Sequence, residues 1–244
     1  MSYMGENNVN EIPDIYFEFD ETQNPIVSSP NSEFSIQFEQ TKESLLEIDT
    51  YKNFISNAVA QFRHSRFYKQ YKSYLIDLGL NRCQYFPNIT VDLLGANGIE
   101  MHHNFLTIYD IALMICEHVL NTEGKITTFK LIHLLKEEHS ENRIPIVMLS
   151  KTVHQMYHNN EEFVIPANQC FGFWMELLYK YRNGITINIA NKVINFLQAS
   201  LEELKGINSS SNYANTLLQL RDHVYNWSIY NEYLDKAKIG QIVY

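Results

Sequence analysis

The spacing of apolar residues along the chain predicts a mainly helical protein. From about Leu45 to Leu80, apolar residues recur every three or four positions, as they do on one face of an amphipathic helix. These residues are Ile48, Tyr51, Phe54, Ile55, Val59 and Phe62. Similar spacing predicts further helices at 107–121, 127–139, 150–159, 168–182, 187–206 and 211–235. We also expect Thr127 or Thr128 to cap the helix at 127–139.

Alternating apolar and polar residues predict only a few short strands. The runs IYFEFD at 15–20 and FSIQFEQ at 34–40 flank a loop rich in Pro, Ser and Asn, which is typical of a hairpin or of edge strands. The pair Asn97-Gly98 is a strong turn signal and predicts a second hairpin, whose second strand is about 98–103. Two more short extended segments are predicted at 144–150 and 162–166. The expected fold class is therefore α+β.

The charge of the chain is unevenly distributed. Residues 1–49 contain eleven Asp or Glu and one Lys, whereas residues 50–244 contain seventeen acids and eighteen Lys or Arg. A nearly neutral body can still bind DNA through a local basic patch and a bound cation. The acidic N-terminal segment can mask a basic groove in cis, mimic nucleic-acid charge toward a partner, or aid solubility, and these three interpretations stay open.

One local basic patch is predicted on the second half of the first long helix. Arg63, Arg66, Lys69 and Lys72 follow one another at steps of three residues, which keeps neighbouring members close on a helix surface. Aromatic residues are interleaved with them. The pattern favours a solvated helix face, with a nucleic-acid contact as the alternative.

Composition limits the compartment and the kind of site. No run of eighteen uncharged apolar residues occurs, and the first residues are acidic where a signal peptide is basic and then apolar. We therefore expect a cytoplasmic protein without a membrane partner. The three cysteines, Cys83, Cys116 and Cys170, are far apart and form no CxxC pair, so a metal must be held by histidine and carboxylate. Cys170 has no evident partner, which makes a Cys-His hydrolase a weak alternative.

Four of the nine histidines stand in a suggestive arrangement. His154 and His158 are four positions apart on a predicted helix, a spacing that lets two imidazoles share a metal ion. His102 and His103 end a predicted strand, where alternation sends neighbouring side chains to opposite sides. One of them can then ligate a metal while the other acts as a general base. Three histidine ligands leave open positions, as a catalytic metal site requires.

The order of these motifs resembles the ββα-metal, or HNH, nuclease motif, in particular its histidine-rich version in nuclease colicins. There, an HH pair precedes a helix that bears HxxxH. The stretches GIEMHHNFLTIYDI, PIVMLSKTVHQMYHN and FVIPANQCFG also resemble a family of phage proteins described as HNH-like. The resemblance covers about residues 82–180. Fifty-one positions separate His103 from His154, which we interpret as a helical insertion whose ends stay close.

The resemblance implies a role for each matching residue. His102, His154 and His158 would ligate one divalent metal ion, which would be zinc, magnesium, manganese or nickel. His103 would be the general base that activates water, and Asn142, the nearest match to the middle Asn of the motif, would orient it. The implied function is a phage-encoded, metal-dependent endonuclease that cuts DNA, or else RNA.

The expected architecture therefore has four parts. They are an acidic extended or hairpin segment at 1–45, a long amphipathic helix at 46–81, an HNH-like ββα-metal core with a helical insertion at 82–182, and C-terminal helices at 183–244. The alternative function is a catalytically inactive phage structural or host-interaction protein with a stabilising metal. The two hypotheses differ in whether substitution of His103 abolishes cutting or loss of metal merely melts the domain.

Overall fold

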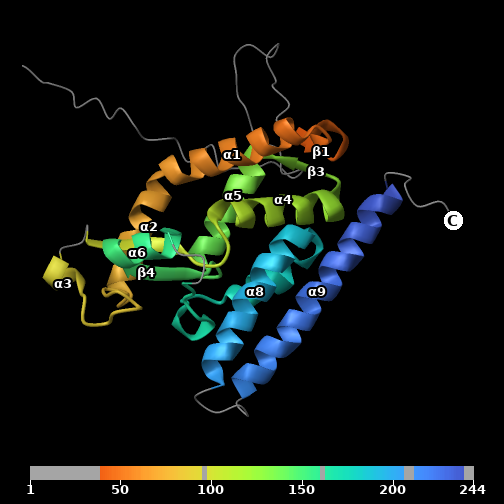
Figure 1. Cartoon of the computed structure of the whole chain (residues 1–244). Coiled ribbons are helices and arrows are strands. Elements are labelled where there is room, and N and C mark those ends of the chain that lie inside the picture. The colour runs from red at the N-terminus through yellow and green to blue at the C-terminus, as the bar shows by residue number, and fades with distance from the viewer. Residues whose placement is uncertain (1–38, 95–97, 160–162, 206–211, 239–244) are drawn as a thin grey trace, which may run out of the picture.

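The computed structural model describes residues 39–94, 98–159, 163–205 and 212–238 (Figure 1). The longer helices in these residues are α1 (Ile48–His64), α2 (Arg66–Asp77), α4 (Ile108–Glu123), α5 (Thr128–Ser140), α6 (Lys151–Asn159), α8 (Ile187–Leu204) and α9 (Asn212–Lys238). The shorter helices are η3 (Glu43–Leu45), α3 (Val91–Leu94), η5 (Ala167–Gln169), α7 (Trp174–Lys180) and η6 (Arg182–Gly184). The strands are β1 (Glu39–Thr41), β2 (Ile99–His103), β3 (Lys125–Thr127) and β4 (Ile146–Ser150).

Helix α4 forms the centre of the hydrophobic core. It packs against α1, α5 and η6, and its buried residues lie on most of its circumference. Thr107 and Asp110 form a reciprocal capping box at its start, and Gly124, at φ 82°, ends it in the left-handed conformation. The buried side chains of α4 include Ile108, Ile111, Ala112, Met114, Ile115, Cys116, Val119 and Leu120.

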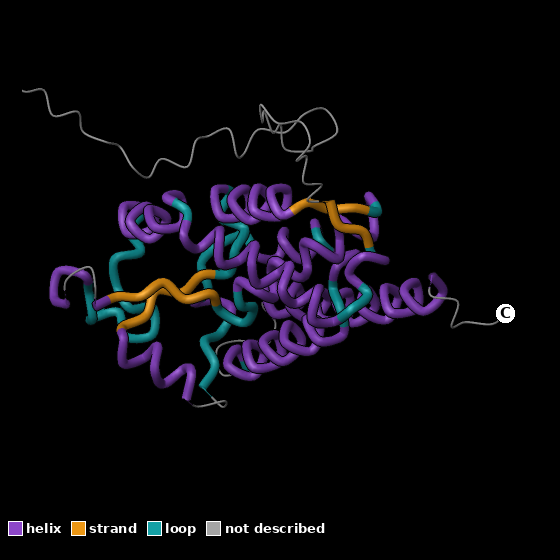
Figure 2. The backbone as a smooth tube through the Cα atoms, turned by 90° about the horizontal axis from the view of Figure 1, so that it is seen from above, coloured by secondary structure: helices purple, strands orange, loops and turns teal. Residues whose placement is uncertain are grey.

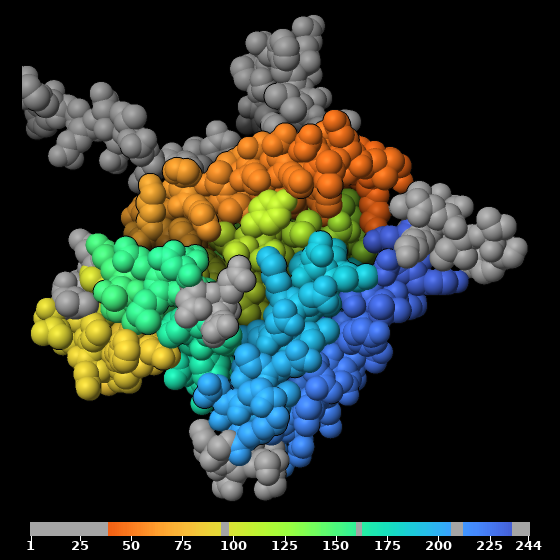
Figure 3. Space-filling view, viewed as in Figure 1, coloured from red at the N-terminus to blue at the C-terminus, as the bar shows by residue number. Residues whose placement is uncertain are grey.

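Helices α8 and α9 lie side by side along one flank of this core (Figures 1 and 3). The amide of Asn231 on α9 donates to the carbonyl oxygens of Arg182 and Ile185, which attaches α9 to η6. The Ser200 hydroxyl on α8 accepts a hydrogen bond from the backbone N–H of Ala167. None of the helices in the described ranges is long and apolar enough to cross a membrane.

Two small antiparallel sheets lie at separate places on the molecule (Figure 2). Strand β1 pairs with β3, and β2 pairs with β4, with Ile99 opposite Ser150 and His103 opposite Ile146. Helix α6 begins directly after β4 and contacts both strands of the second sheet. The structure thus confirms a mainly helical α+β protein.

The expected HNH core is not shown. Strand β2 was predicted to end a local hairpin, but the segment before it contains the short helix α3, and β2 pairs instead with the distant β4. Residues 104–145, expected as an insertion, fold into α4, β3 and α5 and supply much of the hydrophobic core. The pairing of β2 with β4 therefore depends on tertiary packing, which no turn signal reports.

The predicted N-terminal hairpin lies almost wholly outside the described residues. Only its last positions are described, as β1, which pairs with β3. Strand β3 was not predicted, because its three residues join α4 to α5 without an alternating pattern. The predicted cap of α5 is confirmed at Thr127, whose side chain accepts from the backbone N–H of Lys130.

The single long helix expected at 46–81 is wrong, because the chain breaks at Ser65. Ser65 has extended backbone angles of φ −61° and ψ 150°, which end α1 and begin α2. Its hydroxyl donates to the carbonyl oxygen of Phe62 and accepts from the backbone N–H of Tyr68. The apolar periodicity continues across this break, so periodicity alone did not reveal it.

We expect Ser65→Ala to lower the free energy of unfolding by about 1 kcal/mol, the usual cost of losing a serine N-cap. The loss arises because the first backbone N–H groups of α2 lose their acceptor. Urea denaturation of the two proteins measures it. Ser73→Ala, at an exposed position inside α2, is the matched control and should change stability by less than about 0.5 kcal/mol. Equal effects of the two substitutions would contradict the capping role.

Candidate metal centre

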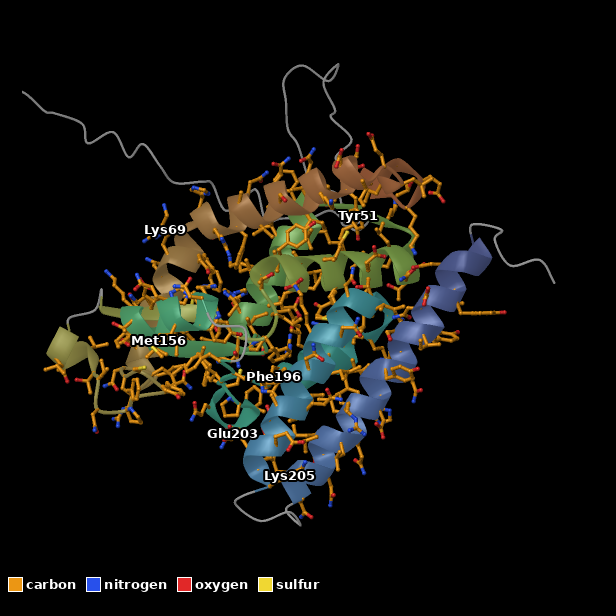
Figure 4. The ribbon with its side chains drawn as sticks, in the orientation of Figure 1. Tyr51, Lys69, Met156, Phe196, Glu203 and Lys205 are labelled. Atoms are coloured by element: carbon orange, nitrogen blue, oxygen red, sulfur yellow. The ribbon has the colours of Figure 1, made fainter. Side chains whose placement is uncertain are left out.

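The candidate site lies where α6 crosses the sheet formed by β2 and β4. Glu100 and His102 are two positions apart on β2, so their side chains share one face of the strand. His154 and His158 are one turn apart on α6. Figure 4 labels Met156 on the same helix, and Figure 1 shows α6 lying against β4. The register of β2 against β4 therefore brings His102 to the two histidines of α6.

Three imidazole nitrogens converge at this point. His102 Nδ1 lies 3.0 Å from His154 Nε2, and His158 Nε2 lies 3.0 Å from the same atom. One nitrogen from each of the three rings lies within 4.8 Å of the others. His102 and His154 are half-buried, and His158 is exposed. The site is thus partly buried at His102 and His154 and open to solvent at His158.

Glu100 orients the central histidine of the three. Its Oε2 lies 2.5 Å from His154 Nδ1. A carboxylate accepts hydrogen bonds, so Nδ1 carries the proton and the lone pair of Nε2 faces the other two rings. This arrangement of carboxylate and histidine is common behind metal ligands. Glu100 was not predicted as part of the site, although its position two residues before His102 on the same strand indicates a shared face.

The surroundings of His102 favour its neutral form. Burial, followed by the neighbouring His154 and His158, lowers the pKa of His102 to about 3. The Tyr157 ring packs against it with ring centroids 4.6 Å apart. His102 Nε2 is buried and has no hydrogen-bond partner among the described residues. A neutral imidazole presents a lone pair at neutral pH, as metal ligation requires.

The donor set indicates which ions His102, His154 and His158 could hold. In a tetrahedral zinc site with Zn–N bonds of about 2.0–2.1 Å, two ligand nitrogens are separated by roughly 3.3 Å. Two of the observed separations, at 3.0 Å, are close to this value. Imidazole nitrogen suits zinc, nickel and copper, whereas magnesium and manganese prefer oxygen ligands. The three histidines could therefore hold a metal ion.

His103 points away from these three histidines and into the core. Only 7% of its surface is exposed, and its Nε2 lies 3.2 Å from Nε2 of His139. His139 Nδ1 donates to the carbonyl oxygen of Leu135, so its Nε2 accepts from His103. Burial first, and then the neighbouring histidines, hold the pKa of His103 well below its usual value. The partnership with His139 was not predicted, since His139 stands alone in sequence.

Asn142 lies at the turn after α5, with a positive φ of 53°. Its side chain accepts from the hydroxyl of Tyr71 at 3.4 Å and donates to the hydroxyl of Tyr74 at 3.2 Å. The Tyr71 ring lies against His139, with centroids 5.1 Å apart. The structure thus brings His102, His154 and His158 together and connects His103 and Asn142 to a different, aromatic cluster. The catalytic roles of His103 and Asn142 stay predictions.

We expect the buried His139 to make stability fall as the pH decreases. Burial lowers its pKa from 6.5 to about 4. Between these two values the unfolded chain binds a proton that the folded chain does not, so the free energy of unfolding falls by up to about 1.4 kcal/mol per pH unit. Above pH 6.5 this contribution is constant.

Urea midpoints at pH 7, 6 and 5, measured with a chelator present, test this expectation. The variant His139→Gln removes the titrating group and should show a shallower fall in stability than the wild type. Parallel pH profiles for the two proteins would show that His139 is not the group responsible.

Cys170 does not support a nucleophilic site. Burial raises the pKa of its thiol to about 12, with a small opposing effect of the Asn104 side chain. The thiolate, which is the reactive form, is therefore scarce at neutral pH. Cys83 and Cys116 are also free and buried.

Comparison with known proteins changes the functional interpretation. The family model described as "Bacteriophage G278-like virion protein" matches residues 4–228. No curated protein and no solved structure matches the chain. The family match overturns the expected membership of the HNH nuclease family, and with it the endonuclease function, the hydrolase activity and the DNA binding inferred from it. It agrees better with the alternative of a phage structural protein.

Proposed function

The chain belongs to the Bacteriophage G278-like virion protein family, and from this premise we propose that it is a non-catalytic structural component of the phage particle, stabilised by one divalent metal ion. The proposed ligands are His102, His154 and His158. The carrying observation is the convergence of their nitrogen atoms within 4.8 Å. The family match replaces the resemblance to HNH nucleases, which suggested an enzyme. The geometry of the three histidines depends on neither the resemblance nor the family match.

A metal at this site would join parts of the chain that are distant in sequence. His102 lies on β2 and the other two ligands on α6, which follows β4. Helix α6 has one buried residue, Val153, so it makes few packing contacts with the sheet. Metal coordination would hold α6 on the sheet more strongly than these contacts do. Binding free energy of this kind adds directly to folding free energy, because the unfolded chain has no preformed site.

The position of His103 supports a structural rather than a catalytic role. His103 was predicted to be the general base, yet its side chain lies on the opposite face of β2 from His102 and is buried against His139. A general base must come within hydrogen-bond reach of the water that it activates.

The ion that best fits three imidazoles is zinc or another borderline divalent ion such as nickel. When bound, such an ion would fix the ring orientations of the three histidines. It would not neutralise any charge of the protein, because these ligands are neutral. The carboxylate of Glu100 would fix the tautomer and the ring orientation of His154 from behind. Solvent, or a group from a neighbouring protein of the particle, would complete the coordination on the exposed side at His158.

Titration of the chelator-stripped full chain with zinc tests the proposal. We expect one ion per chain, measured by elemental analysis after gel filtration. At a free zinc concentration of 100 times the dissociation constant, the gain in stability is about 2.7 kcal/mol, which corresponds to a rise in Tm of roughly 5–10 °C for a chain of this size. Absence of stoichiometric binding, or binding without a rise in Tm, would contradict the stabilising role.

A second measurement tests the non-catalytic part. The zinc-, nickel- and manganese-loaded chain is incubated with supercoiled plasmid at low salt, and we expect no conversion to nicked circles above that of His102→Ala. Metal-dependent nicking by the wild type that His102→Ala lacks would overturn the proposal.

A further inference from the structure

Positive and negative charge are segregated between two segments of the chain. Residues 50–76 contain five Lys or Arg and no Asp or Glu. Residues 1–38 contain seven Asp or Glu and no Lys or Arg. The first segment covers most of α1 and α2, whereas the second precedes the described residues. Segregation of this kind makes the two segments electrostatic complements.

The described part of the basic segment presents its cations to solvent. Arg63 at the end of α1 and Arg66 and Lys69 on α2 are exposed, and no ion pair joins any of them to an acid among the described residues. We call these three residues the basic face. Figure 4 shows Lys69 on the outer side of α2, and Figure 3 shows α1 and α2 as the outer layer at one edge of the molecule.

The acids of the neighbouring helix are already paired elsewhere. Helix α5 packs against both α1 and α2. Its residues Glu137 and Glu138 bind Arg143 and Lys180. These carboxylates therefore do not neutralise the basic face, whose cations are available to another acidic group.

We propose that the basic face is the docking site of residues 11–21 of the same chain. This stretch, EIPDIYFEFDE, holds five of the seven acids of the N-terminal segment. In an extended conformation its residues alternate, so that Tyr16, Glu18 and Asp20 share one side and Ile15, Phe17 and Phe19 the other. The acids Glu18 and Asp20 on one side of the stretch complement the positive charge of the cations on the helix surface.

Partly exposed apolar residues of α2 and its C-terminal end suit the apolar side of the acidic stretch. Tyr74 on α2 is 41% exposed, and Leu78, which caps the end of α2, is 51% exposed. Phe67 and Tyr68, interleaved with the cations, are half-buried. Arginine next to aromatic rings also favours contacts between its guanidinium and the ring faces of Phe or Tyr.

The chain is long enough to make this contact in cis. Eighteen positions separate Glu21 from Glu39, the first residue of β1, and an extended chain of that length spans up to about 60 Å. From Ile48 to Arg63, α1 rises by only about 23 Å. Since β1 leads through η3 directly into α1, residues 11–21 can reach the basic face without strain.

Zero-length crosslinking of the full chain with a carbodiimide tests the proposal, because this reagent joins a lysine amine only to a carboxylate in contact with it. We expect peptides that link Lys69 to residues 11–21, with yields that fall several-fold when salt is raised from about 0.05 M to 1 M. Lys205, exposed at the far end of α8 (Figure 4), is the matched control and should give no such link. Mixing isotopically labelled and unlabelled chains separates links within one chain from links between two.

A variant in which the five acids of residues 11–21 are neutralised tests whether this stretch competes with a nucleic acid for the basic face. It carries Glu11→Gln, Asp14→Asn, Glu18→Gln, Asp20→Asn and Glu21→Gln. If the acidic stretch covers the basic face, a single-stranded oligonucleotide at low salt should bind the variant at least tenfold more tightly than the wild type. Arg66→Gln with Lys69→Gln in the variant should remove that gain.

Three results would overturn the proposal. One is a yield of links to residues 11–21 no higher at Lys69 than at Lys205. Another is mixed links, in which a labelled peptide is joined to an unlabelled one, at the share that random pairing of chains gives, which would assign the occupant to a second copy. The third is equal oligonucleotide affinity of wild type and neutralised variant, which would leave the basic face uncovered by this stretch.

Discussion

Replacement of His154 by alanine is expected to lower zinc affinity by more than about 100-fold, because His154 is the central ligand of the proposed site. Its Nε2 lies 3.0 Å from a nitrogen of each of the other two histidines. Loss of a group behind a ligand already costs roughly 10- to 100-fold in affinity, so loss of the ligand itself should cost more. The rise in Tm on adding zinc should disappear with it.

Isothermal titration with zinc measures the affinity of His154→Ala, and the affinities of two further variants serve as comparisons. Glu100→Gln keeps the shape of the side chain that supports His154 and should weaken binding by about 10- to 100-fold. His64→Ala removes an exposed histidine of α1, outside the site, and should leave the affinity unchanged. An affinity of His154→Ala within threefold of the wild type would show that zinc binds elsewhere.

Replacing Glu138 by alanine is expected to lower the free energy of unfolding by about 3–5 kcal/mol, the usual cost of breaking a buried ion pair from one side. The Glu138 side chain is fully buried. It accepts hydrogen bonds from Arg143 Nε at 2.5 Å, Lys180 Nζ at 2.7 Å and the Tyr181 hydroxyl at 2.7 Å. Burial alone would raise its pKa, but these three donors lower it overall. Removing the carboxylate leaves the partners without their shared acceptor.

The neighbouring Glu137 provides a matched control. It contacts the same two cations, Lys180 at 2.8 Å and Arg143 at 3.4 Å, but its side chain is 39% exposed. Exposed ion pairs contribute less than about 1 kcal/mol, so Glu137→Ala should have a small effect. Urea denaturation of both variants at pH 7 compares them. Similar losses for Glu137→Ala and Glu138→Ala would mean that burial does not decide the strength of this network.

Local sequence patterns predicted the helices well because helix signals are local. The structure places α4 at Ile108–Glu123 and α8 at Ile187–Leu204, close to the predicted 107–121 and 187–206. The break at Ser65 escaped because a serine cap does not interrupt the spacing of apolar residues. The partner of β2 could not be predicted, since antiparallel pairing over fifty positions depends on how α4 and α5 pack.

The candidate site was partly predictable because some of its signals are also local in sequence. HxxxH on a helix and HH on a strand are local patterns, and the structure brings three of those four histidines together. Strand alternation correctly separated His102 from His103, but only the fold shows that His103 faces His139. The functional class did not follow from these residues, because one arrangement of histidines suits both catalytic and structural metal sites.

The long-range pairing of β2 with β4 also bears on how the molecule reaches its folded state. The β2–β4 ladder closes a loop that contains residues 104–145, since Ile99 must meet Ser150. We expect this ladder to form after the local helices, because contacts between residues distant in sequence must first offset the entropy of loop closure. The histidines of β2 and α6 would then meet only near the end of folding. Metal would therefore slow the unfolding of the finished protein rather than speed its formation.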